Sequence, residues 1–84
     1  MFLHVIAVRH KGQYSLELVF NDSSIKDVDL TPELYGEVFE PLRDVEFFRL
    51  VSVNPETNTI EWPNGADFAP EFLHKIGKDV GVVA

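Results

Sequence analysis

The chain has 84 residues, no cysteine, and a formal net charge of −7 from 14 acidic and 7 basic residues. This length predicts one domain over residues 1–84, with room for one hydrophobic core but not for a deep cleft. The absence of cysteine from the sequence excludes disulfides and thiolate metal sites. The negative charge argues against direct nucleic-acid binding, which needs a cationic surface, and favours a small, basic protein as partner. The alternative is that the acidic residues only keep the domain soluble.

Hydrophobic residues make up 45% of the chain, which predicts a folded monomer or a small symmetric homodimer rather than disorder. No apolar run approaches the roughly 18 residues that a membrane-spanning helix needs. The first ten residues also lack the apolar core of a signal peptide. We therefore expect no membrane association and a cytoplasmic location.

In chain order, the first element is a predicted antiparallel hairpin over about residues 3–20, whose two apolar runs flank Lys11-Gly12. Gly12 is expected to supply a positive φ in the turn. The first run is apolar on both faces, which indicates a strand that is buried on both sides. A helix would pack on one face, and a dimer partner is a candidate for the other. Residues 25–30 then alternate charged and apolar side chains, as is typical of a short edge strand.

Short helices are expected around residues 32–48, with Thr31 as the N-cap and Pro32 as the first helical residue. Gly36 and Pro41 keep these helices short. Their spacing predicts a core-facing set of seven side chains: Leu34, Tyr35, Val38, Phe39, Leu42, Phe47 and Phe48.

A second hairpin is predicted over about residues 49–62, with Asn58 in the left-handed region of its turn. A C-terminal helix is predicted around residues 68–76, with Asp67 as its cap and Gly77 as its stop. Phe68, Phe72 and Ile76 would form its apolar stripe. The last residues are apolar enough for a short strand but fit a frayed end equally well. Together these elements predict an α+β fold.

The sequence shows no arrangement that points to catalysis. His4 and His10 are six residues apart on one predicted strand, about 20 Å by strand rise, so they cannot share a metal ion. His74 belongs to the last predicted helix. No serine stands in a nucleophile elbow, and no glycine-rich phosphate loop occurs. We therefore predict no catalytic, cofactor-binding or metal-binding residues.

Two groups of polar residues are candidates for a binding surface. Residues 27–46 contain seven acidic side chains and one basic one, and the candidates for contact with a basic partner are Asp27, Asp29, Glu33, Glu37 and Glu40. A solvated face explains such acidic residues as well. The second group is the corner formed by Trp62, Asn64 and Asp67, where the indole could be a platform for a ligand or peptide. Core packing, a turn and a helix cap explain the same three residues structurally.

Residues 28–73 carry a more specific pattern. Its most distinctive part is Trp62-Pro63-Asn64-Gly65-Ala66-Asp67 followed by Ala69-Pro70-Glu71, and the segments before it are Asp29-Leu30, FEPLRD at 39–44, Phe47 with Val51 and Val53, NPET at 54–57 and Thr59-Ile60. With these residues the chain resembles the bacterial family catalogued as domain of unknown function 2442. Asn58 stands where that turn often has glycine, and asparagine adopts the same geometry.

The resemblance implies a small α+β domain of unestablished activity, with no catalytic residues to carry over. Some members look like one half of a toxin–antitoxin module, encoded beside or fused to a small partner domain, and some carry a C-terminal helix-turn-helix. Three hypotheses remain open. The chain is a non-enzymatic, antitoxin-like interaction domain, a ligand-binding or enzymatic domain built on Trp62, Asn64 and Asp67, or a transcription-related accessory domain that reaches DNA through a partner.

Overall fold

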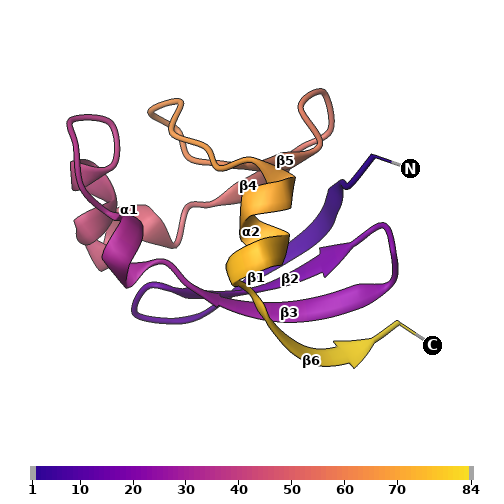
Figure 1. Cartoon of the computed structure of the whole chain (residues 1–84). Helices are drawn as coiled ribbons and strands as arrows, with labels where there is room; N and C mark the ends of the chain where they lie inside the picture. Colours follow the sequence, from indigo (N-terminus) through magenta and orange to yellow (C-terminus); the bar gives the residue numbers. More distant parts are fainter. Residues whose placement is uncertain (1, 84) are drawn as a thin grey trace.

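The computed structural model describes residues 2–83, which form two antiparallel sheets and several short helices (Figure 1). The larger sheet has the strand order β1-β2-β3-β6, and the smaller sheet pairs β4 with β5. The strands are β1 (Val5–Gly12), β2 (Ser15–Phe20), β3 (Ser24–Asp29), β4 (Ser52–Asn54), β5 (Thr59–Glu61) and β6 (Lys78–Val82). This arrangement confirms the α+β fold and both predicted hairpins.

The helices described in residues 2–83 are the 3-10 helices η1 (Thr31–Glu33) and η2 (Glu40–Arg43), then α1 (Val45–Phe48) and α2 (Pro70–Ile76). Gly36 lies between η1 and η2 at φ +89°, a conformation that glycine adopts without strain and that interrupts the helix. Figure 1 shows α2 beside the larger sheet and leading directly into β6. None of these helices is long and apolar enough to cross a bilayer.

The strand predicted at the sheet edge, β3, lies inside the sheet, so that part of the prediction is wrong. β6 pairs antiparallel with β3, from Ser24↔Val82 to Asp27↔Lys78, and this leaves β1 and β6 as the outer strands. The charged residues of β3 have cross-strand partners instead of facing an open edge. The ammonium of Lys26 lies 3.0 Å from the carboxylate of Asp79, which is on β6.

The turn geometry follows the sequence, whereas two of the predicted helix caps are wrong. Gly12 and Asn58 have the expected positive φ angles of +143° and +62°. Thr31, expected as an N-cap, is instead the first residue of η1, and its amide and hydroxyl both donate to Asp29 Oδ1. These bonds, the hydroxyl first, lower the pKa of Asp29. Asp67 is not a cap, because α2 begins at Pro70 and no side chain caps it.

The core lies between the larger sheet, the smaller sheet and the helices. Its fully buried side chains include Leu16, Leu18, Phe20, Val28, Leu30, Leu42, Phe48, Ile60, Trp62 and Leu73. Tyr35 and Val38, both predicted to face the core, are 67% and 51% exposed, because the chain around Gly36 is not helical. In α2 the buried residue is Leu73 and Ile76 is 37% exposed, since the helix begins later than predicted and presents another face.

A hydrogen bond connects α2 to the turn between β2 and β3. His74 Nε2 lies 3.0 Å from Asp22 Oδ2, and the His74 ring packs edge-on against Phe20 with a centroid distance of 5.0 Å. Asp22 Oδ1 accepts from the hydroxyl and the amide of Ser24 at 2.6 and 2.9 Å. The Ser24 bonds, and to a smaller extent His74, lower the pKa of Asp22 to about 2.

Replacing Asp22 with asparagine is expected to flatten the acid dependence of stability. The folded pKa of Asp22 lies below its ordinary value of 3.8, so its carboxylate stabilises the fold above about pH 4 and this contribution disappears as the pH falls toward 2. The variant should therefore be less stable than wild type at neutral pH and lose less stability across that window. Urea unfolding at about pH 7, 4 and 2.5 measures this, with Glu56→Gln in an exposed turn as the control. Parallel pH profiles for wild type and Asp22→Asn would contradict the prediction.

Candidate functional site

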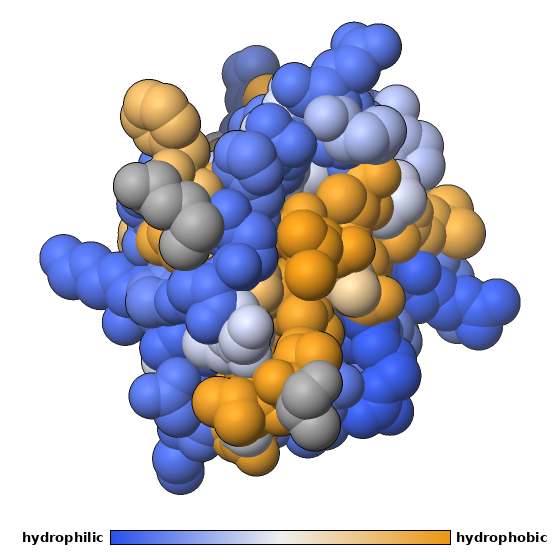
Figure 2. Space-filling view, turned by 90° about the vertical axis from the view of Figure 1, so that its right-hand side faces the viewer, coloured by the Kyte–Doolittle hydropathy of each residue, from blue (hydrophilic) through white to orange (hydrophobic). Residues whose placement is uncertain are grey.

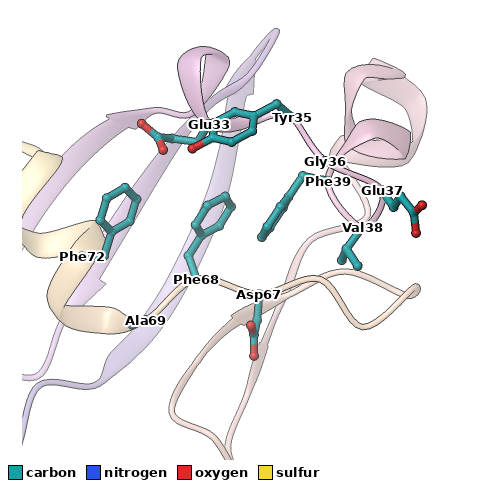
Figure 3. Close-up of a pocket in the computed structure, with 10 residues that line it drawn as sticks. All are labelled: Glu33, Tyr35, Gly36, Glu37, Val38, Phe39, Asp67, Phe68, Ala69 and Phe72. Carbon is teal, nitrogen blue, oxygen red and sulfur yellow. The ribbon is translucent and has the colours of Figure 1, made fainter.

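An open groove with a volume of about 580 Å³ lies between residues 33–39 and residues 67–72 (Figure 3). The first segment runs from the end of η1 to the start of η2, and the second leads from the smaller sheet into α2. The two sides are therefore about 30 residues apart in the sequence and meet only in the folded chain. Both sides belong to regions where glycine or proline interrupts regular structure.

The floor of the groove is a row of three phenylalanine rings. The ring centroids of Phe39 and Phe68 are 4.8 Å apart with an interplanar angle of 26°, and those of Phe68 and Phe72 are 5.9 Å apart at 17°. Phe68 is 9% exposed and contacts Trp62 edge-on, whereas Phe39 and Phe72 are half-buried. The row is thus an extension of the core that reaches the surface, with Tyr35 and Val38 beside it.

Three carboxylates surround this apolar floor. Glu33, Glu37 and Asp67 lie on different sides of the aromatic row (Figure 3). Their side chains make no hydrogen bond or ion pair with any residue in the range 2–83. Among these described residues, no lysine, arginine or histidine lines the groove. The site therefore combines an apolar surface with negative charge that no side chain in residues 2–83 compensates.

The remaining acidic candidates lie outside the groove. Asp27 forms an ion pair of 2.7 Å with Lys11 and, together with Asp29, lines a smaller pocket of about 380 Å³ against β6. Asp29 also holds Thr31 at the start of η1. Glu40 is exposed at the first residue of η2. The acidic side chains of residues 27–46 therefore do not form one surface. Of the candidates in this segment, only Glu33 and Glu37 line the groove.

The three residues of the Trp62 corner do not share one site either. Trp62 is 2% exposed, and its Nε1–H donates to the carbonyl of Phe48 at 2.7 Å, so its ring belongs to the core. Asn64 donates through Nδ2 to the carbonyl of Val38 at 2.9 Å and thereby joins the turn after β5 to the opposite wall of the groove. Of the three corner residues, only Asp67 lines the groove.

Sequence spacing alone does not distinguish the apolar part of this site from the core. Tyr35, Val38, Phe39 and Phe72 were assigned to the core because their spacing suits a helix, yet all four line the groove. The available signal was Gly36, which follows Tyr35 and interrupts the helical spacing. A glycine at this position turns its neighbours outward, and the flanking residues Glu33 and Glu37, one on each side, are consistent with a surface loop.

A second exposed apolar surface lies on another side of the molecule. Figure 2 shows an apolar band between hydrophilic flanks, and the lower end of the band lies at the C-terminal residues. Val80, Val82 and Val83 are 48%, 74% and 49% exposed, whereas Ile6, which is 57% exposed, lies on β1 at the opposite edge of the larger sheet. Apolar surface of this kind is typical of protein–protein contacts. Whether the chain is a monomer or a homodimer stays a prediction. No group of three His, Asp or Glu side chains in residues 2–83 could hold a metal ion.

Comparison with known proteins gives a family without an assigned activity. A model of the family described as Protein of unknown function (DUF2442) matches residues 5–79. No curated protein matches the chain. No solved structure matches it either.

Proposed function

This chain belongs to the family described as Protein of unknown function (DUF2442), and we propose that it is a non-enzymatic interaction domain that binds a cationic partner protein. The observation that supports this proposal is the groove between residues 33–39 and 67–72. Its apolar floor adjoins three carboxylates that have no partner within residues 2–83. A basic and apolar segment of another protein is the complementary surface.

The two properties of the groove have separate roles in binding. Apolar surface removed from water contributes affinity of about 25 cal/mol per Å² before the costs of association. The carboxylates contribute selectivity and a faster encounter, because opposite charges steer the partner and like charges repel competitors. The formal charge of −7 on the whole chain adds to this long-range attraction. In its specific form, the proposal makes this protein the antitoxin-like, cytoplasmic member of a toxin–antitoxin-type pair.

Reversing the groove charges is expected to weaken binding of the partner by on the order of tenfold or more, since each exposed ion pair contributes up to about 1 kcal/mol and reversal adds repulsion. The test variant is Glu33→Lys/Glu37→Lys/Asp67→Lys. Its matched control is Glu46→Lys/Glu56→Lys/Glu71→Lys, which changes the net charge equally at three exposed residues outside the groove. The partner is captured from cells with the wild-type chain, identified by mass spectrometry, purified and titrated calorimetrically against all three proteins.

The proposal predicts that the control triple variant binds nearly as well as wild type and that added salt weakens binding. Equal losses in both triple variants would mean that only net charge matters, and the groove would not be the site. If no purified partner bound wild type at concentrations on the order of micromolar, corresponding to about −8 kcal/mol, the interaction role itself would be rejected.

A further inference from the structure

We propose that the groove accepts an amphipathic α-helix of the partner, with apolar residues spaced one helical turn apart and lysine or arginine on both flanks. This inference rests on the proposed function and specifies the structure of the segment that binds. Three features of the groove support it: the hydrogen-bond donors that it offers, the spacing of its rings and the placement of its carboxylates.

The side chains of the groove cannot satisfy an extended backbone. Among the described residues that line it, Tyr35 carries the single side-chain hydrogen-bond donor, its hydroxyl. The nearby donors are already engaged, because Trp62 Nε1–H bonds the Phe48 carbonyl and Asn64 Nδ2–H bonds the Val38 carbonyl. An extended segment that buries its backbone against these side chains would find few partners among them, which is costly. An α-helix satisfies its own backbone and needs no such donors.

Addition of a strand is also unsuited to this site. Recognition by strand addition requires the open edge of a sheet, whereas the lining comes from η1, the loop around Gly36, the residues before α2 and Phe72 in α2. None of the strands β1 to β6 described in residues 2–83 contributes a lining residue. Recognition therefore depends on side chains that enter the groove, as in helix-in-groove complexes.

The spacing of the floor matches the pitch of a helix. Successive centroid distances along the row are 4.8 Å from Phe39 to Phe68 and 5.9 Å from Phe68 to Phe72, on either side of the roughly 5.4 Å pitch of an α-helix. Alternate residues of a strand are about 6.6 Å apart. Apolar side chains at i, i+3 or i+4, and i+7 of a helix along the row would lie over it, against the half-buried rings of Phe39 and Phe72.

The carboxylates predict where the cations of the helix lie. Figure 3 shows Glu33 on one side of the row, Asp67 on the other side and Glu37 beyond its Phe39 end, so cations on both flanks of the apolar stripe have a carboxylate on their side. Lysine and arginine have stems long enough to cover apolar surface while their charged ends reach a rim. A helix with acidic flanks would meet like charges on each side and is excluded.

The test uses two acetylated and amidated peptides of about 18 residues, long enough for a marginal helix in water, made of leucine, lysine and alanine in identical composition. One places leucine at helical spacing, and the other alternates leucine and lysine with the period of a strand. Calorimetry and far-ultraviolet circular dichroism follow both titrations. The helical isomer should bind at least tenfold tighter than its counterpart and gain helical signal on binding.

Variants of two exposed residues that line the groove test whether the peptide binds there. Tyr35→Ser/Val38→Ser should weaken binding of the helical peptide about tenfold, whereas Leu50→Ser should not, because Leu50 is 52% exposed but does not line the groove. Tyr35 and Val38 are themselves 67% and 51% exposed, so both variants should keep wild-type unfolding curves. Equal binding of Tyr35→Ser/Val38→Ser and wild type would overturn the inference.

The remaining outcomes separate the two proposals. If both isomers bind equally and the triple lysine variant of the groove loses both, the interaction role stands and the helix is rejected. If neither isomer binds while the purified partner does, the helix is likewise rejected. If neither the peptides nor any partner binds, the proposed function fails and the helix fails with it.

Discussion

Replacing Trp62 with alanine is expected to lower the free energy of unfolding by about 3–5 kcal/mol, the range for removing a large aromatic side chain from a core. The ring is 2% exposed and packs against Phe48 and Phe68 at centroid distances of 5.4 and 5.9 Å. A chain of this size has a total stability of about 5–15 kcal/mol. The variant should therefore be partly unfolded near 37 °C.

Trp62→Phe separates the packing of the ring from its hydrogen bond. Phenylalanine keeps an aromatic ring but loses the Nε1–H that donates to the Phe48 carbonyl. That carbonyl keeps the amide of Val51 as a donor at 3.3 Å, so the expected cost is that of one hydrogen bond, about 0.5–1.5 kcal/mol. Both variants lack the chain's single tryptophan, so tryptophan fluorescence cannot report their unfolding. Urea unfolding followed by circular dichroism measures the free energy of unfolding of each variant. Leu50→Ala, at a side chain that is 52% exposed, should stay within about 0.5 kcal/mol of wild type. Wild-type stability in Trp62→Ala would contradict the place of this ring in the core.

The second large effect is expected at Gly77, where alanine should lower the free energy of unfolding by about 1–3 kcal/mol through overpacking. A Cβ at this position would lie 2.9 Å from the carbonyl oxygen of Leu73 and 2.9 Å from Cβ of Lys26. Its φ of −70° suits any residue, so the close approach of α2 to β3 is what requires glycine. The added methyl group must push the two elements apart and disturb the pairing of Lys26 with Asp79.

Gly81 is the matched control for Gly77. It lies in β6, four residues after Gly77, but its added Cβ would come no closer than 3.8 Å, to Cδ1 of Ile25, and alanine there should be neutral or slightly stabilising through the unfolded state. Urea unfolding compares the two variants, and hydrogen exchange should show faster exchange of the β6 amides in Gly77→Ala alone. Equal stability of both variants would show that the contact between α2 and β3 is not tight.

The groove shows how far the sequence could lead to a candidate site. Charge counting singled out Glu33 and Glu37, and the unusual composition around Trp62 singled out Asp67, as two separate surfaces. The structure brings these three carboxylates to one groove and removes Trp62 to the core. The phenylalanine row was missed because a half-buried phenylalanine and a fully buried one have the same local pattern, and only the path of the chain around Gly36 distinguishes them.

By itself the sequence determined the features that depend on a few neighbouring residues. Both hairpins, the left-handed Asn58 and the end of α2 before Gly77 follow from turn and terminus chemistry, which acts within about four residues. The tertiary structure alone decided that β6 lies beside β3, with Ile25 paired to Gly81, and that residues 33–39 meet residues 67–72. Such contacts depend on which apolar surfaces become buried together after the whole chain has collapsed, and local periodicity carries no record of that choice.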